Sequence, residues 1–252
     1  MYRYELKILK GTLEYVKEEL LEKLPLIEIL SENETEIILE SSVEDIEEFR
    51  ILLSPLLITQ LASGKSINLS RREWRKEFVP AGINPSLAYI LCKMAKLSEN
   101  DILYDPFCGA SVIPITALKY FNAKRVICSD ISGKAIFKSK VNFKVANISE
   151  SKYLLFQSDI KNVRLNKQNV DRIVTNLPFG IRAGNHEGNI QIYSELETLA
   201  KKILRKKGFL LLLTQEKKLL REVFNKENWL LRSVARIDVG GLKPEVFVIE
   251  RR

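Results

Sequence analysis

The chain has 252 residues, of which 46% are hydrophobic, and a formal net charge of +8. That length supports one sizeable core and a smaller additional unit. The sequence has no apolar run of about 18 residues or more, and its charged start lacks the apolar core of a signal peptide, so we expect no membrane span and a cytoplasmic location. Three scattered cysteines and one histidine argue against a metal site.

The charge is divided unevenly along the chain. Residues 1–70 hold seven Lys/Arg and fourteen Asp/Glu, a net charge of −7, whereas the remainder carries +15. A basic body favours an anionic partner such as nucleic acid. A lysine-rich solvated surface would give the same count.

The first 70 residues predict a small α+β unit. Apolar residues alternate as in strands over 2–9, 26–30, 35–40 and 56–62, and recur at helical spacing over 12–24 and 43–53. The order β-α-β-β-α-β is typical of a ferredoxin-like unit. We expect this unit to span 1–70, with an arginine-rich linker and leading helix over 71–98 and the main domain over 99–252.

The main domain predicts an α/β fold, because strands and helices alternate from residue 102. We expect strands at 102–105, 125–129, 153–157, 172–175 and 209–214, and helices near 85–97, 111–121, 133–146, 190–206 and 215–226. Such alternation indicates a Rossmann-like parallel sheet covered on both faces. The last two strands, 230–238 and 245–250, are joined too closely for a crossover and must pair antiparallel.

Acidic residues follow three successive strands of this sheet, at Asp105, Asp130 and Asp159. In open α/β sheets, ligands bind at the carboxyl ends of the strands. Asp130 is placed to accept both ribose hydroxyls of an adenosine, and Asp159 to accept from an adenine amino group, with Ile131 and Ile160 against the ring. Each acid taken alone is equally typical of a helix cap or a turn.

A turn of small residues follows Asp105 and completes the expected cofactor site. Its candidate contacts are Phe107, Cys108, Gly109, Ala110 and Ser111. Small residues let the backbone approach a ligand closely. The turn is not G-x-G-x-x-G and has no P-loop lysine, so a dinucleotide or ATP is poorly supported.

The segment Asn176-Leu177-Pro178-Phe179-Gly180 follows the fourth strand and is the expected catalytic loop. The exocyclic amino group of a base is a weak nucleophile and must be oriented to attack a methyl sulfonium. The Asn176 side-chain oxygen and the Pro178 carbonyl can each accept one amino hydrogen, and Phe179 can stack on the base. Asn176 faces the same crevice as the cofactor, so we count it as a cofactor contact as well.

These motifs resemble the RNA guanine-N2 methyltransferases of the THUMP-containing tRNA group. The likeness rests on DPFCGAS at 105–111, SDIS at 129–132, QSDI at 157–160, NLPFG at 176–180 and INPSLAYIL at 83–91. It covers roughly residues 71–250 and implies S-adenosylmethionine as cofactor and a tRNA guanosine, methylated at N2, as substrate. The family loop often carries Pro where this chain has Leu177.

The resemblance also implies an RNA-binding surface. Residues 1–70 match the ferredoxin-like part of such proteins and leave no room for a THUMP domain before Arg71. The expected RNA contacts are therefore Arg71, Arg72, Arg75 and Arg182, with the basic run 201–207 as a further candidate or a protein partner in place of the missing domain.

Two other functions are compatible with the same residues. Asn-x-Pro-Phe loops suit any planar amino group, including adenine N6, cytosine N4 and a protein glutamine amide. A non-catalytic RNA-binding subunit would keep the fold without the reaction, although all three acids and the loop are present.

Overall fold

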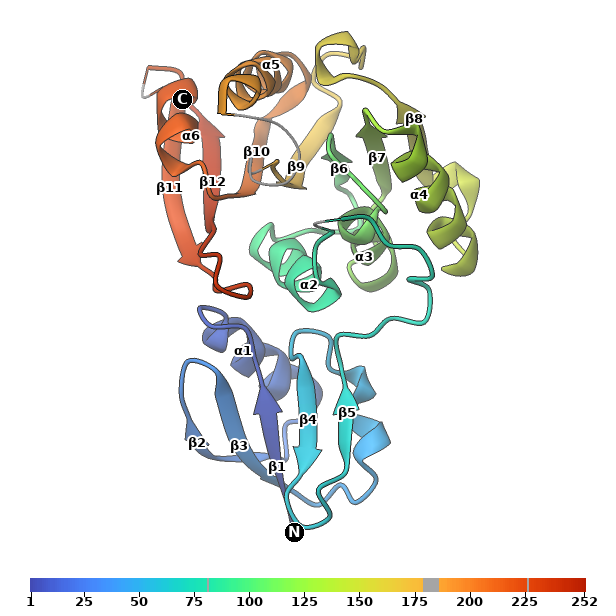
Figure 1. Ribbon diagram of the computed structural model, residues 1–252, viewed down its shortest axis with the longest axis vertical. Helices are drawn as coiled ribbons and strands as arrows, with labels where there is room; N and C mark the ends of the chain where they lie inside the picture. The colour runs from blue at the N-terminus through green and yellow to red at the C-terminus, as the bar shows by residue number, and fades with distance from the viewer. Residues whose placement is uncertain (81, 179–185, 226) are drawn as a thin grey trace.

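The computed structural model describes residues 1–80, 82–178, 186–225 and 227–252. It contains two sheets, one of five strands near the N-terminus and one of seven strands built from the rest of the chain (Figure 1). Among the described residues no helix is both long and apolar enough to cross a membrane.

The five-stranded sheet has the order β2-β3-β1-β4-β5, with every neighbouring pair antiparallel. Its strands are β1 (Tyr2–Lys7), β2 (Glu28–Glu32), β3 (Glu36–Ser41), β4 (Leu57–Gln60) and β5 (Ser66–Asn68). Helix α1 (Leu13–Lys23) buries Val16 and Leu20 in the core that β1 and β3 line with Tyr4, Leu6, Ile37 and Leu39. The order of β1 to β4 is that of the expected ferredoxin-like unit.

Two details of this unit differ from expectation. The helix expected over 43–53 is wrong: the structure has a short 3₁₀ helix, η1 (Ile46–Ile51), opened by the Asp45 side chain. Its buried residues Ile46 and Phe49, and Leu52 directly after it, recur every three positions, which is the 3₁₀ period rather than the α period. Strand β5 also adds a fifth strand to this unit, after the last strand expected over 56–62.

The seven-stranded sheet has the order β11-β12-β10-β9-β6-β7-β8, in which β8, β7, β6, β9 and β10 run parallel. Its strands are β6 (Ile102–Asp105), β7 (Arg125–Asp130), β8 (Tyr153–Gln157), β9 (Val170–Asn176), β10 (Leu204–Thr214), β11 (Trp229–Arg236) and β12 (Glu245–Arg251). Strand β12 pairs antiparallel with both β10 and β11. The expected parallel sheet with a closing antiparallel hairpin is confirmed.

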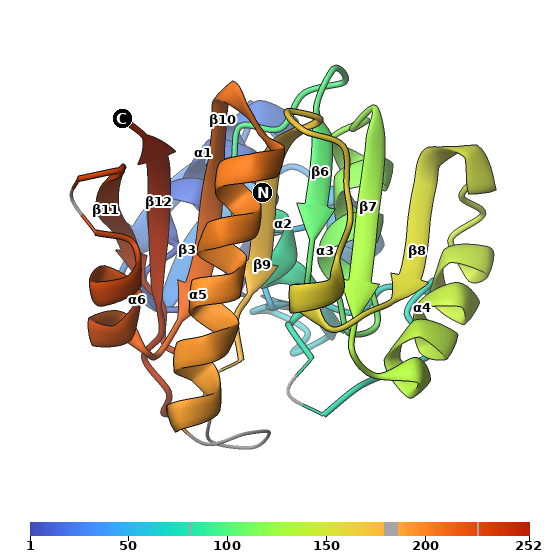
Figure 2. The ribbon, with the colours of Figure 1, turned by 90° about the horizontal axis from the view of Figure 1, so that it is seen from above.

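Helices cover both faces of this sheet, as Figure 2 shows. One face packs against α2 (Pro85–Met94), α3 (Val112–Tyr120) and α4 (Gly133–Val145), and the other against α5 (His186–Ile203) and α6 (Lys217–Val223). Alternate residues of β10 face the two cores: Leu211 faces the first group of helices, and Leu210 and Leu212 face the second. Because β8, β7, β6, β9 and β10 run parallel, they all end at one edge of the sheet.

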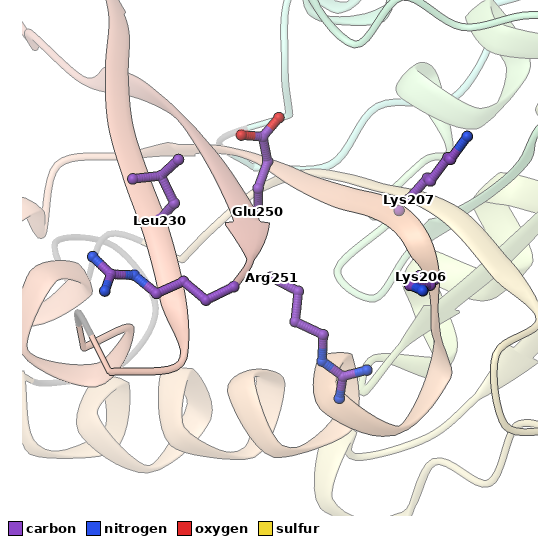
Figure 3. A pocket seen from close by; sticks show the side chains of 7 residues that line it. Lys206, Lys207, Leu230, Glu250 and Arg251 are labelled. Carbon is purple, nitrogen blue, oxygen red and sulfur yellow. The ribbon is translucent and has the colours of Figure 1, made fainter.

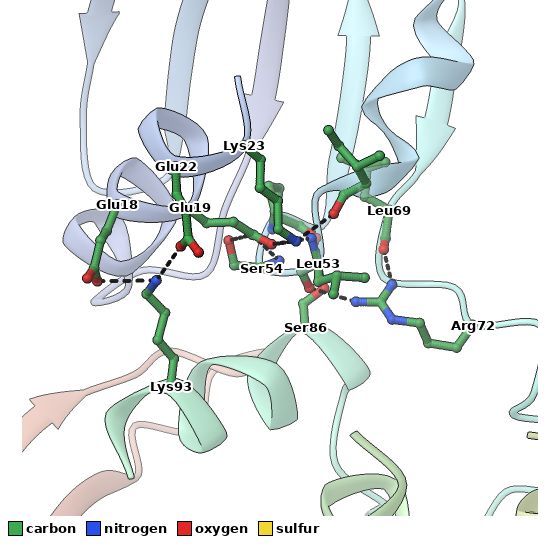
Figure 4. Close-up of polar contacts among 12 residues, drawn as sticks. Glu18, Glu19, Glu22, Lys23, Leu53, Ser54, Leu69, Arg72, Ser86 and Lys93 are labelled. Carbon is green, nitrogen blue, oxygen red and sulfur yellow. Dashed lines mark hydrogen bonds and ion pairs between the residues drawn. The ribbon is translucent and has the colours of Figure 1, made fainter. Parts of the chain in front are cut away.

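A buried carboxylate organises the junction between the two sheets (Figure 4). Glu19 of α1 has no exposed surface; it accepts hydrogen bonds from the Leu53 and Ser54 amides at 2.9 and 2.8 Å, and also from the Ser54 hydroxyl. Lys23 pairs with it at 2.6 Å. Glu19 thus fixes the segment 53–54 that precedes β4, and the next residue, Pro55, offers its carbonyl to Ser86 of α2 at 2.7 Å.

Further contacts join the two parts of the chain around this point. Lys93 of α2 lies 3.4 Å from Glu18 and 3.3 Å from Glu22. Gly11 has φ +90°, and a Cβ there would lie 2.0 Å from the Arg236 carbonyl oxygen, so only glycine fits this approach to the last residue of β11.

Arg72 belongs to the same junction. Its side chain is buried, with the residue 7% exposed, and its guanidinium donates to the Leu53 carbonyl at 2.6 Å and to the Leu69 carbonyl. The guanidinium is therefore committed to backbone acceptors and not available to a phosphate. The expected RNA contact by Arg72 is contradicted by this burial.

Replacing Glu19 should destabilise the whole chain. Glu19→Ala leaves the Lys23 ammonium and the buried donors of residues 53–54 without their acceptor, so the free energy of unfolding should fall by about 3–5 kcal/mol. Glu19→Gln keeps one acceptor oxygen and should lose less. Urea unfolding followed by circular dichroism measures both.

The matched control is Glu22→Ala. Glu22 is exposed and pairs with Lys93 at the surface, so its loss should cost below about 1 kcal/mol. A Glu19→Ala variant as stable as Glu22→Ala would show that the buried carboxylate does not organise the junction.

Candidate active site

The residues expected from sequence to bind a cofactor lie together at the carboxyl edge of the seven-stranded sheet. Strands β9, β6, β7 and β8 are consecutive neighbours there. Asp105 ends β6, Asp130 ends β7, Asp159 follows β8 and Asn176 ends β9. Four strand ends thus place three carboxyl groups and one amide along one line of the molecule.

Asp105 ties the first loop to the strand that carries Asn176. Its Oδ1 accepts from the Thr175 hydroxyl at 2.6 Å and from the Phe107 amide at 3.2 Å. Asp105 is almost fully buried, and this burial raises the pKa of its carboxyl to about 7. These contacts make Asp105 the residue that fixes the loop against β9.

The turn after Asp105 is built for close approach of a ligand. Gly109 and Ser111 both have left-handed backbones, with φ of +54° and +58°, a conformation that suits glycine and is uncommon for serine. The Ser111 hydroxyl donates to Ser139 of α4 at 2.9 Å, and Ser139 donates to the Gly109 carbonyl at 2.7 Å. A Cβ on Gly109 would lie 3.1 Å from the Val79 side chain, so a larger residue would crowd the linker.

Asp130 joins this turn to the next loop. Its Oδ2 accepts from the Gly109 amide at 2.9 Å and its Oδ1 from the Ser132 amide at 2.8 Å. Each carboxylate oxygen can accept more than one hydrogen bond, so both oxygens can still receive hydroxyl groups. Ile131, directly after it, is 66% exposed and offers apolar surface beside the carboxylate. This pairing suits a ribose with an attached flat base.

Asp159 has a structural partner of its own. Its Oδ1 accepts from the Lys161 amide at 3.2 Å and caps a short 3₁₀ helix, η3 (Ile160–Asn162), while Oδ2 lies 3.4 Å from the Lys161 ammonium. Ile160 is 7% exposed and packs in the core. The contact of Asp159 with an adenine stays a prediction, alongside the cap that the structure shows.

The last residue of β9 carries a buried polar atom that has no partner among the described residues. The Asn176 Oδ1 is buried and makes no hydrogen bond within the part of the chain that the structure describes. Leu177 donates its amide to the Leu213 carbonyl at 3.0 Å, and its side chain is buried. A proline at this position, which the resembling family often has, could not donate that hydrogen bond. Leu177 therefore adds a backbone hydrogen bond to β10 in this chain.

Pro178 is held by a residue that the sequence motifs do not reveal. The Tyr193 hydroxyl of α5 lies 3.2 Å from the Pro178 carbonyl and 2.7 Å from the Thr214 hydroxyl, and the Glu216 amide donates to Thr214 at 2.9 Å. A carbonyl only accepts, so Tyr193 must donate to Pro178 and Thr214 must donate to Tyr193. Three hydrogen bonds thus run in one direction from the start of α6 to the Pro178 carbonyl.

The remaining expected residues are placed as follows. Arg71 is exposed, and Arg75 is half-buried, with its guanidinium 4.7 Å from the Phe78 ring, where burial lowers its pKa. Cys108 and Ala110 are buried and Phe107 is partly buried in the loop after β6. Phe179 and Arg182 lie outside the described residues.

These residues fit S-adenosylmethionine, on the chemistry of their donor set. Asp130 offers two oxygens for ribose hydroxyls, the Gly109 turn leaves room for backbone approach, and the acidic edge suits a cationic ligand. The Asn176 Oδ1 is a buried acceptor in need of a donor, and an amino group would supply it.

Comparison with known proteins agrees with this geometry. Residues 72–245 match the family model described as RMKL-like, methyltransferase domain. The chain is 29% identical over 187 residues to the tRNA (guanine(6)-N(2))-methyltransferase THUMP3 of Bos taurus, covering 69% of this chain and 37% of that protein. It is 23% identical to the tRNA (guanine(6)-N2)-methyltransferase of Methanocaldococcus jannaschii, covering 77% of this chain and 60% of that protein.

The match to these curated relatives thus spans between about a third and three fifths of their length. Among solved structures, TrmN from Thermus thermophilus superposes over the whole of both chains with a TM-score of 0.81 at 17% identity. At that identity the similarity establishes the fold.

The buried Asp105 carboxyl predicts a pH-dependent stability. Its pKa of about 7 in the folded chain lies above the ordinary value of 3.8. The folded state therefore holds this proton more tightly, so the stabilisation is full at acidic pH and is lost as pH rises through 7. We expect the difference in unfolding free energy between wild type and Asp105→Asn to shrink from pH 5 to pH 7.5 and then level off.

Denaturant titrations at several pH values measure this difference. Subtracting the Asp105→Asn profile removes every other titrating group. A difference that grows with pH would mean that Asp105 is ionised when folded and would contradict the effect of burial described above.

Proposed function

We propose that this chain, which belongs to the RMKL-like methyltransferase domain family, transfers a methyl group from S-adenosylmethionine to the N2 amino group of a guanosine in tRNA. The observation that carries the proposal is the buried Asn176 oxygen, which makes no hydrogen bond with any residue that the structure describes and lies two residues before the Pro178 carbonyl. Two acceptors at one strand end suit a planar amino group with two hydrogens.

The cofactor supplies the electrophilic methyl group. Asp130 and the Gly109 turn would hold its ribose and the adjoining chain. Asn176 Oδ1 accepts one hydrogen of the substrate amino group. The Pro178 carbonyl accepts from the Tyr193 hydroxyl with one lone pair and can accept the other amino hydrogen with its second lone pair. The two hydrogen bonds turn the amino lone pair toward the methyl group, so the rate gain comes mainly from positioning. The amino proton can leave after transfer.

Guanine in tRNA is supported by the relatives rather than by the loop. The proteins of Bos taurus and Methanocaldococcus jannaschii carry guanine-N2 activity on tRNA in their names. Adenine N6, cytosine N4 and glutamine amides have the same amino chemistry, and the +15 charge of residues 71–252 favours a nucleic acid over a protein substrate. A purely RNA-binding role is disfavoured because the two acceptors and Asp130 are all in place.

A basic hollow at the opposite edge of the sheet supports an RNA substrate (Figure 3). It measures about 580 Å³ and is lined by Lys206, Lys207, Arg251 and Arg252, together with Leu230, Glu250 and Gly208. Lys206 and Lys207 are exposed, whereas Lys201 pairs with Glu197 and Arg205 with Asp171. Lys202 of the basic run is exposed as well, but Lys206 and Lys207 are the exposed lysines of the run that line the hollow, so we expect them to contact phosphates there.

Two further assignments belong to the proposal. We divide the chain into a ferredoxin-like unit at 1–70, a linker with leading helix at 71–98 and a catalytic domain at 99–252; β5 ends at Asn68, α2 at Met94, and β6 begins at Ile102. We assign the protein to the cytoplasm, where the free thiols of its three cysteines are stable.

Two substitutions separate cofactor binding from transfer. Asn176→Ala removes an acceptor of the substrate amino group, so methyl transfer to unmodified tRNA should fall by about a hundredfold or more while cofactor affinity stays near that of wild type. Asp130→Ala should instead weaken cofactor binding, since it removes the proposed ribose acceptor. Labelled-cofactor assays with nucleoside analysis, and calorimetry, measure the two effects.

Label found in N6-methyladenosine, or found only in DNA, would contradict the guanine assignment. Full activity of Asn176→Ala would show that the loop after β9 is not the catalytic loop.

Charge reversal tests the basic hollow. Lys206→Glu with Lys207→Glu should weaken RNA binding and lower the steepness of its salt dependence by about one unit for each phosphate that these lysines neutralise, with cofactor binding unchanged. The matched control, Lys7→Glu with Lys65→Glu, makes the same charge change on the N-terminal sheet, where both lysines are more than half exposed. Equal weakening by both pairs would show a general charge effect and no RNA binding at the hollow.

A further inference from the structure

Helix α5 carries a buried stripe whose first position is polar. Tyr193, Leu196, Ala200 and Ile203 recur at helical spacing and have no exposed surface. Asn189, four residues before Tyr193, continues this stripe and is 1% exposed. A polar residue at a core position departs from the pattern of the rest of the helix, and such departures concentrate at functional sites.

The Asn189 side-chain amide finds no hydrogen-bond partner among the residues that the structure describes: both its Oδ1 and its Nδ2 are buried and make no hydrogen bond there. In the described parts of the chain, buried side-chain atoms without a partner belong to three residues, Arg75, Asn176 and Asn189. Buried amides are normally hydrogen-bonded, so both an acceptor and a donor at Asn189 await a ligand.

The direction of α5 places Asn189 beyond the end of β9, which carries Asn176. The helix runs opposite to β9 and β10, so it begins at their carboxyl edge (Figure 2). Tyr193 is level with the strand ends, because its hydroxyl contacts Pro178 and Thr214. Asn189 lies about 6 Å farther along the helix axis, beyond the strand ends and on the same helix face. That is the side on which a base held by Asn176 and Pro178 must lie.

We propose that Asn189 recognises the edge of the target base, its Oδ1 accepting from guanine N1–H and its Nδ2 donating to O6. This inference rests on the proposed function and deepens it. Along one edge, guanine presents the N2 amino group, then N1–H, then O6. Asn176 and Pro178 occupy the amino group, and the remaining donor and acceptor match one amide. Adenine bound by its amino group has no hydrogen on N1 and would leave the Asn189 oxygen unpaired.

A guanine analogue isolates this contact. 2-Aminopurine keeps the 2-amino group but lacks N1–H and O6. In an RNA carrying either base at the methylated position, wild type should prefer guanine by about 10- to 100-fold in kcat/KM. Asn189→Leu, which completes the apolar stripe, should reduce transfer to guanine by a similar factor and methylate both bases at comparable rates.

Tyr193→Phe is the matched control on the same helix face. It removes the hydroxyl that orients the Pro178 carbonyl, so it should slow transfer to guanine and to 2-aminopurine by the same factor. A readout independent of activity comes from stability: Asn189→Leu removes two buried unpaired polar atoms and should raise the melting temperature by about 2–4 °C.

Two results would overturn the proposal. If Asn189→Leu slows transfer to both bases equally, or leaves the preference for guanine intact, Asn189 does not contact N1–H and O6. A wild-type chain that transfers no methyl group to tRNA would overturn the proposed function together with it, whereas an active wild type with an unchanged base preference in Asn189→Leu overturns this inference alone.

Discussion

The hydrogen bond from Thr175 to Asp105 is the contact on which the arrangement of the site depends. At 2.6 Å, and between two buried residues, it joins the loop after β6 to the end of β9. In the loop after β6, which contains Asp105, the Gly109 amide donates to Asp130; at the end of β9, directly after Thr175, Asn176 begins the catalytic loop. The proposed cofactor and substrate contacts therefore share one buried link, and a shift at Asp105 would move both. Such coupling matters for a transfer that requires three atoms in line.

The same region holds buried polar atoms that make no hydrogen bond within the described parts of the chain: Oδ1 of Asn176, and Oδ1 and Nδ2 of Asn189. A buried polar group without a partner costs about 1–3 kcal/mol. The neighbouring Leu177 and Tyr193, by contrast, each make a hydrogen bond at this end of the sheet. The proposed substrate would supply the missing hydrogen-bond donors and acceptor at these two positions. A base whose edge does not match would leave these atoms unpaired, so it would bind less tightly.

Sequence patterns predicted the parallel sheet, its antiparallel hairpin and the strand-end acids, because alternation and strand-end placement are local properties. The misses have a different origin. The 3₁₀ helix at Ile46–Ile51 follows from a three-residue repeat that resembles an α-helical one over so short a segment. The burial of Arg72 depends on carbonyls of Leu53 and Leu69 contributed by the folded junction. Tyr193 resembles an ordinary core residue until Pro178 is found against its hydroxyl.

If the substrate is an RNA, as proposed, the acidic N-terminal unit would limit the directions from which it can approach. Glu19, Ser86 and Lys93 fix it against α2, so its net charge of −7 stays at one side of a body that carries +15. The backbone of the proposed RNA substrate would be repelled from the first and attracted to the second, which would orient the encounter before any specific contact forms. The basic hollow lies at the amino edge of β10, about 20 Å from the catalytic loop on the strand rise between Lys207 and Leu213. An RNA substrate of the proposed kind would have to span that distance across the sheet to contact both the hollow and the catalytic loop.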